Sequence, residues 1–258
     1  MGEAGGRLRI ENGTLALTIA PEFLGSAISL ERKGEELLRS AYPEARPLCW
    51  ENPWFGGIQP RLGGITRRDL VRERARVREI QRRGSQGIVW RGVRVSWSPK
   101  HEQARHSGLA VDYLLAPGSG ILAVALRTTR RADTASWLDA GFDLFPVLGG
   151  SPLDAVLTGQ PDTRAQRIRC EYGGEVRGNR WVMAENPKAG EAALLAGPGG
   201  ETGTHGQVYG RDGYFLSAGI GSAHEARETK EAVFFISFTS ADGARDLAEA
   251  LSELKELP

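Results

Sequence analysis

The chain has 258 residues, of which 40% are hydrophobic and 25% are charged, as in ordinary globular proteins. Its formal net charge of +1 provides no overall field that would attract nucleic acid or an anionic membrane surface. Two cysteines are too few for a disulfide framework, the first residues lack the apolar stretch of a secretory signal, and no apolar run is long enough to span a bilayer. We therefore expect one cytoplasmic domain over residues 1–258, with no nucleic-acid or membrane partner.

The first half of the chain carries the turn signals of antiparallel hairpins. Asn12-Gly13 supplies the positive φ angles that a tight turn between two strands requires. A second turn is predicted from Pro117 to Gly120, between two apolar runs. Strands are expected at residues 8–10, 15–19, 27–30, 87–97, 109–115 and 121–127.

The second half continues the same pattern and then changes. A turn signal at 211–213 separates strands near 207–209 and 214–216, and 233–238 is a continuous apolar strand. After Ser240, a typical N-cap residue, apolar residues recur at helical spacing. The sequence therefore predicts an all-β, two-layer antiparallel sandwich with one C-terminal helix at about 241–256.

An arginine-rich stretch lies between residues 67 and 83, where eight arginines face only three acidic residues. Its alternating arginines are typical of the solvated face of a strand whose charges protect a sheet edge. An alternative is a protein-interaction surface that includes Arg72, Arg74 and Arg76.

Common catalytic and cofactor motifs are missing. His101 and His106 are five residues apart, whereas a zinc-binding helix needs histidines four apart on one face, so we expect no metal. The glycines at 197–203 match neither a phosphate loop nor a dinucleotide fingerprint, which predicts a loop there and no cofactor. Neither a serine-hydrolase elbow nor a cysteine-protease signature is present.

The most informative segment is 47–61, which combines aromatic rings with polar groups in a Pro- and Gly-rich loop. Indole rings offer flat apolar faces to the C–H faces of sugars, while carboxylates, amides and guanidinium groups bind hydroxyls. We expect a carbohydrate ligand here, with His101 and His106 as further contacts. The alternative is that the aromatic residues fill the core under a rigid turn. The candidate binding residues in this segment are Trp50, Glu51, Asn52, Trp54 and Arg61.

Several stretches resemble the galactose mutarotase-like superfamily, to which the aldose epimerases belong. Residues 15–38 are similar to its opening hairpin, and the Pro47–Trp50 and Pro53–Gly57 elements to a loop near the sugar site of its hexose-phosphate epimerases. Residues 109–127 and 137–145 resemble its middle strands. The resemblance implies a two-sheet antiparallel supersandwich whose concave face holds a saccharide, with Arg61 as a substrate-binding arginine.

Mutarotase chemistry needs a histidine acid and a glutamate base. Where the resemblance places the histidine, this chain has Ala140-Gly141, and where it places the glutamate, residues 214–219 contain no carboxylate. The leading hypothesis is a carbohydrate-binding or ancillary module within a longer polypeptide. The alternatives are a divergent epimerase, lyase or hydrolase using Glu51 with His101 or His106, and a structural or protein-interaction domain.

Overall fold

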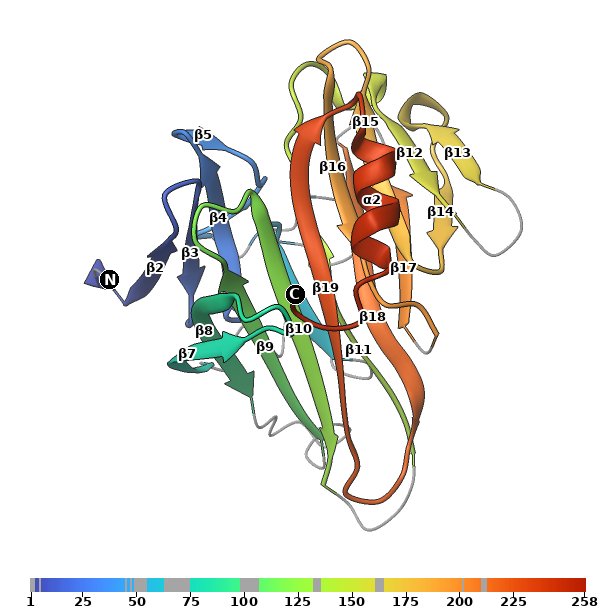
Figure 1. The fold of residues 1–258 in the computed structure, drawn as a ribbon. Helices are drawn as coiled ribbons and strands as arrows, with labels where there is room; N and C mark the ends of the chain where they lie inside the picture. The colour runs from blue at the N-terminus through green and yellow to red at the C-terminus, as the bar shows by residue number, and fades with distance from the viewer. Residues whose placement is uncertain are drawn as a thin grey trace.

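The chain folds into two stacked antiparallel sheets of ten and nine strands, with one C-terminal helix (Figure 1). The computed structural model describes residues 3–4, 6–44, 46, 48, 55–62, 75–97, 107–131, 136–160, 165–200, 202–209 and 213–258. The predicted all-β, two-layer architecture is confirmed. Within these residues, no helix combines the length and the apolar content that crossing a membrane requires.

The ten-stranded sheet runs in the order β1-β2-β3-β4-β6-β11-β18-β17-β14, with β5 paired to β4. Its first strands form the predicted hairpin around Asn12, whose side-chain oxygen accepts from the backbone N–H groups of Thr14 and Leu15. The strands are β1 (Glu3–Ala4), β2 (Arg7–Glu11), β3 (Leu15–Ala20), β4 (Ser26–Arg32), β5 (Glu35–Glu36), β6 (Ile58–Leu62), β11 (Ser136–Leu144), β14 (Glu175–Gly178), β17 (Thr202–Val208) and β18 (Tyr214–His224).

The nine-stranded sheet runs in the order β13-β12-β15-β16-β19-β10-β9-β8-β7. The hairpin predicted after residue 115 joins β9 to β10. The strands are β7 (Arg76–Arg83), β8 (Val89–Trp97), β9 (Ser107–Leu115), β10 (Ile121–Arg130), β12 (Val156–Gly159), β13 (Gln166–Arg169), β15 (Trp181–Asn186), β16 (Glu191–Ala196) and β19 (Thr229–Ser240). Two short 3-10 turns, η1 (Pro152–Asp154) and η2 (Cys170–Tyr172), flank β12 and β13.

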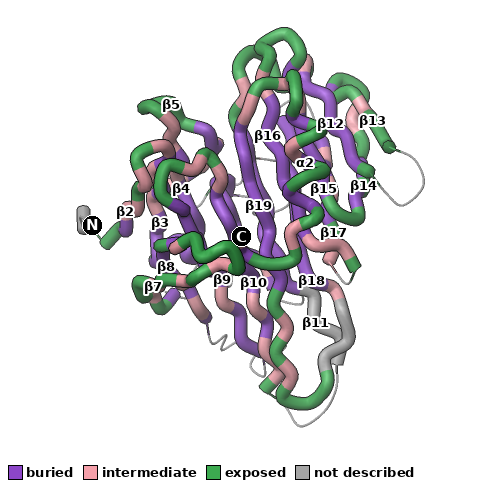
Figure 2. The backbone as a smooth tube through the Cα atoms, in the orientation of Figure 1, coloured by how far each residue is buried: buried purple, intermediate pink, exposed green. Residues whose placement is uncertain are grey.

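The main core lies between the two sheets, because alternate side chains of each strand point inward. Leu17 and Ile58 of the first sheet and Val93 and Val111 of the second have no exposed surface. Figure 2 shows the same pattern, with buried residues along the central strands and exposed residues on β5, β7 and β13 at the periphery. Burial of this apolar area is the main force that holds the layers together.

The helix α2 (Ala244–Ser252) covers the outer face of the nine-stranded sheet, as the sequence predicted for a sheet edge or face (Figure 1). Ala248 and Leu251 pack into an apolar cluster with Trp90 and Phe235 of that face. The outer face of the ten-stranded sheet carries a different set of residues, many of them polar.

The predicted N-terminus of this helix was wrong. Ser240 ends β19, and its hydroxyl donates to the carbonyl of Asp242 at 2.9 Å rather than capping the helix. The N-cap is Gly243, whose φ of 81° is a left-handed conformation that glycine adopts without steric cost. The helix is also shorter than predicted, because it ends at Ser252.

Candidate functional site

A row of polar residues crosses the outer face of the ten-stranded sheet. Strand register aligns Gln59 of β6, Asp143 of β11, Ser217 of β18, His205 of β17 and Arg177 of β14 as successive neighbours. On one strand, residues two apart share a face, and in register the faces of neighbouring strands coincide. Five strands from distant parts of the sequence therefore place five polar side chains side by side.

The centre of this row is buried and hydrogen-bonded. Asp143 is 1% exposed and Ser217 is fully buried. The Ser217 hydroxyl donates to Asp143 Oδ1 at 2.8 Å, and Arg61 Nε lies 3.5 Å from the same oxygen. A buried carboxylate is costly unless it is paired. Arg61 and Ser217 are therefore the partners of this buried carboxylate and fix its position.

A second row, two residues further along each strand, consists of Arg61 followed by three glycines. Arg61 is in register with Gly141, Gly141 with Gly219, and Gly219 with Gly203. A Cβ atom added to Gly141 or Gly219 would lie 2.8 or 2.9 Å from Arg61 Nη2. The guanidinium group therefore lies directly over the bare backbone of these two glycines.

Part of each row lines a surface hollow of about 490 Å³ beside β14, β17 and β18. Its lining includes Arg177 and His205 of the first row, Arg61, Gly203 and Gly219 of the second, and Glu175.

Two ion pairs set the charge of the described part of this hollow. Arg61 lies next to Asp143, and Arg177 Nη2 lies 3.1 Å from Glu175 Oε1. Arg177 and Glu175 are both exposed, so this pair adds little to stability. Each cation of the hollow therefore has a carboxylate beside it.

Burial in this hollow has its clearest effect on the pKa of His205. Its ring packs edge-on against Phe215, with ring centroids 5.9 Å apart. Burial lowers the pKa of His205, and the nearby Asp143 partly opposes this shift. The imidazole is therefore neutral at pH 7, with one nitrogen that donates and one that accepts a hydrogen bond.

Of the predicted binding residues, Arg61 lines a surface hollow, and its role in binding stays a prediction. Trp50, Glu51, Asn52, Trp54, His101 and His106 lie outside the described residues, so their roles stay predictions. The predicted loop at 197–203 is wrong at its end, since Thr202 and Gly203 begin β17. His205 was missed, because a single histidine between Thr204 and Gly206 carries no motif.

Among the described residues, no three His, Cys, Asp or Glu side chains lie close enough together to hold a metal ion.

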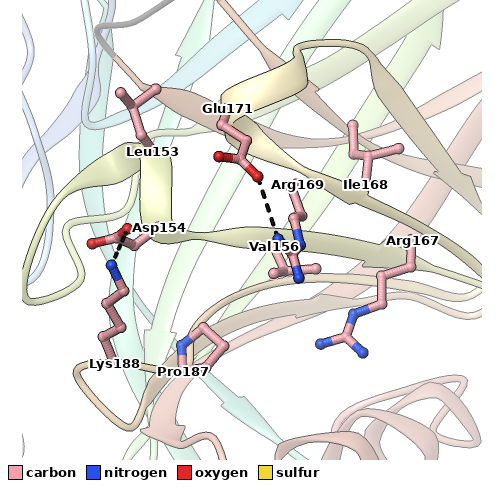
Figure 3. A pocket seen from close by; sticks show the side chains of 9 residues that line it. All are labelled: Leu153, Asp154, Val156, Arg167, Ile168, Arg169, Glu171, Pro187 and Lys188. Carbon is pink, nitrogen blue, oxygen red and sulfur yellow. Dashed lines mark hydrogen bonds and ion pairs between the residues drawn. The ribbon is translucent and has the colours of Figure 1, made fainter.

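A second hollow, of about 530 Å³, lies between η1, β12, β13 and residues 187–188 (Figure 3). Figure 3 shows Lys188 paired with Asp154 at 2.7 Å and Arg169 paired with Glu171 at 3.4 Å. Its arginines and lysine are more than half exposed. Its charged side chains therefore lie mostly in solvent. The first hollow contains the largely buried Arg61 and is the better candidate site.

Comparisons with known proteins identify the fold. No family model matches the chain, and no curated protein sequence matches it significantly. Among solved structures, a galactose mutarotase-like protein from Lactobacillus casei ATCC 334 has 14% sequence identity and a TM-score of 0.66, covering 91% of this chain and 100% of that one. A galactose mutarotase related enzyme from Lactobacillus acidophilus has 13% identity and a TM-score of 0.62, covering 91% of this chain and 97% of that one.

A third similar structure shows the same fold in a longer chain. A TPR-domain containing protein from Parabacteroides distasonis ATCC 8503 has 15% identity and a TM-score of 0.58, and the match covers 90% of this chain but 47% of that one. At these identities the likeness concerns the fold. The chain has the galactose mutarotase-like fold, as the resemblance in its sequence implied.

Proposed function

We propose that this protein binds a carbohydrate in the hollow on the outer face of the ten-stranded sheet and does not interconvert sugar anomers. The observation that carries this proposal is the pairing of a polar row with a bare glycine row. His205 and Arg177 of the polar row supply hydrogen-bonding groups, and Gly203 and Gly219 of the glycine row leave room beside them.

The chemistry of the hollow suits hydroxyl groups. Glu175 accepts hydrogen bonds, Arg61 and Arg177 donate them, and a neutral His205 does both. Because each arginine already stands beside a carboxylate, the described groups form mixed donor and acceptor sets. A sugar hydroxyl, which donates and accepts at once, is matched by such a set.

The backbone beneath Arg61 supports binding over catalysis. The resemblance places the acid histidine just before Phe142 and the glutamate base within residues 214–219, and Gly141 and Gly219 face each other in those two stretches. A Cβ atom at Gly141 would clash with the carbonyl oxygen of Ala218, and one at Gly219 would lie 2.8 Å from the carbonyl oxygen of Ala140. Ring opening needs a positioned acid and base, and these two positions do not accommodate side chains.

A divergent carbohydrate-active enzyme is the second candidate, and His205 is the observation that favours it. Its pKa is lowered by burial, and it lines the same hollow as Glu175. A neutral imidazole beside a carboxylate is a chemically sensible acid–base pair. This pair differs from Glu51 with His101 or His106, which the sequence suggested.

The occurrence of this fold within a longer chain supports an ancillary role. In the Parabacteroides distasonis protein, the matched part is about half of a polypeptide that contains a TPR domain. A binding module of this kind would hold a saccharide close to an activity on another domain. An ancillary role beside another domain is therefore part of the proposed function.

The test measures binding and turnover with the same sugars. Saturation-transfer difference NMR with D-glucose, D-galactose, maltose and lactose should show transfer from the wild-type protein, and Arg61→Ala should reduce it strongly. Arg167→Ala is the matched control, since it removes an arginine from the second hollow. Absence of transfer to any of these sugars or to a wider glycan panel would overturn the proposal. Polarimetry of the same aldoses should give the uncatalysed mutarotation rate, and a faster rate lost in His205→Gln would favour the enzyme.

A further inference from the structure

At most of the glycines in the strands around the hollow, a larger side chain would collide with neighbouring atoms of the protein. Gly141 and Gly219 lie under Arg61 and against backbone carbonyls of the neighbouring strand. Gly206 faces the core, where a Cβ would lie 3.3 Å from Leu216 and Val176. A glycine in a strand usually marks such a close approach of other atoms.

Gly203 is the exception. It lies near the start of β17, in register with Gly219, and lines the hollow. Among the described residues, no atom lies within 4 Å of the position of an added Cβ. Its φ is not in the left-handed region, so any residue fits the backbone there. Neither packing nor backbone conformation within the described structure therefore requires glycine at this position.

Glycine at such a position lowers the stability of the strand, and no contact within the described structure compensates for it. It loses more conformational freedom on folding than other residues and adds no side chain to the pleated surface. A β-branched residue at the same place would strengthen the strand. One recognised reason for a bare backbone in a strand is that a ligand comes close to it, and Gly203 lines the hollow.

We propose that Gly203 is a specificity-determining residue, at which the ring of the bound saccharide lies directly on the backbone of β17. This inference rests on the proposed carbohydrate-binding function and adds where in the hollow the ring sits. It also predicts that a substitution which stabilises β17 weakens sugar binding, because the added side chain would occupy the place of the ring.

The neighbours of Gly203 fit this position. His205 is two residues along the same face of β17, roughly 6.6 Å away by strand rise. On the neighbouring strand, Gly219 carries Arg61 above it. A sugar ring placed flat on Gly203 turns its C–H face to the peptide backbone, and its edge hydroxyls toward His205 on one side and Arg61 on the other. The flat floor favours a saccharide ring without axial substituents on the face that it turns to the protein.

The experiment compares Gly203→Val with Gly120→Val. Gly120 is the matched control, because it also has open space around an added Cβ and no left-handed φ, and it lies at the hairpin between β9 and β10. Saturation transfer to D-glucose, D-galactose, maltose and lactose is measured for both variants and for the wild type, and thermal unfolding is followed for each.

The expected result is loss of saturation transfer in Gly203→Val, with an unfolding temperature equal to or above that of the wild type. Gly120→Val should keep the wild-type signal. If the wild type binds and Gly203→Val binds equally well, this inference is overturned while the proposed function stands. If the wild type binds none of the sugars or the wider panel, the proposed function fails and the inference with it. Gly203→Ala, which adds one methyl group, distinguishes steric blocking from misfolding, because it should weaken binding partially in a folded protein.

Discussion

Single residues of the hollow owe their chemistry to burial and close partners. Asp143 is held in place because Arg61 and Ser217 contact the same carboxylate oxygen. The pKa of His205 is lowered, since desolvation disfavours its protonated form. One face of the sheet therefore holds a buried, paired carboxyl group and a neutral imidazole on strands separated by one other strand.

The shift of His205 predicts a loss of stability in acid. Because its pKa is lower when folded than its ordinary value of 6.5, the unfolded chain binds the proton more readily between those two values. The unfolding free energy of the wild type should therefore fall, relative to His205→Gln, as the pH drops below about 6.5. Glutamine keeps a polar side chain but does not titrate. Urea unfolding of both proteins between about pH 8 and pH 5 checks this.

Four charged groups also affect the pKa of His205. Asp143 and Glu175 favour the protonated form, whereas Arg61 and Arg177 disfavour it, and desolvation is the largest effect. The other histidines are common to both proteins and cancel in the difference. Stability curves that stay parallel over the whole pH range would contradict the assignment.

At the scale of elements, local turn chemistry and periodicity predicted many strands but not all. The hairpin could be predicted from Asn12-Gly13, and the central strand from the apolar run at 233–238. In both cases the signal lies within a few consecutive residues. The short strands between Val156 and Ala196 carry no such signal, since their pairing partners decide them. The helix start was placed three residues early because Ser240 has the right chemistry but already belongs to β19.

The arginine-rich strand β7 is confirmed as an edge of the nine-stranded sheet. Arg82 pairs with Glu231 at 2.6 Å and lies 3.4 Å from buried Asp112, so it is fixed by the sheet. Arg76 and Arg78 are exposed, and neither makes an ion pair with another described residue. Charged side chains on an edge strand discourage pairing with other chains.

Replacing Arg76 and Arg78 together by Val should therefore promote self-association through β7. The double variant gains β-propensity and loses the repulsive charge at the edge. Size-exclusion chromatography with light scattering should show species larger than those of the wild type or loss to aggregate. The control replaces Arg245 of α2 and Lys188 between β15 and β16, which removes the same charge away from the edge. Equal elution of both variants would contradict the role of β7 as a protected edge.

At the scale of the whole molecule, the sequence predicted the architecture better than the site. Apolar alternation and turns recur along the whole chain, so the sandwich emerges from many local signals. The site depends on register among strands that begin at residues 58, 136, 175, 202 and 214, and no local motif encodes that register. A family resemblance pointed to Arg61 as a binding residue, whereas no sequence signal pointed to His205.

The contact between the two layers is partly polar, at Tyr113 of β9. Its hydroxyl lies 3.3 Å from the carbonyl oxygens of Gly25 and Ile58, which belong to the other sheet layer. Complete burial raises the pKa of Tyr113, so the hydroxyl stays protonated and donates. A second cross-layer contact is the edge-on pair of Phe142 and Phe234, with ring centroids 5.5 Å apart.

Tyr113→Phe removes this hydrogen bond while keeping the ring in the core. The unfolding free energy should fall by about 1 kcal/mol, because a buried carbonyl loses its donor. Tyr172→Phe is the control, since Tyr172 is 78% exposed and its hydroxyl is available to water. Chemical denaturation gives both values, and the transition should remain single if the layers unfold together. An unchanged midpoint in Tyr113→Phe would mean that this hydrogen bond does not stabilise the contact between the layers.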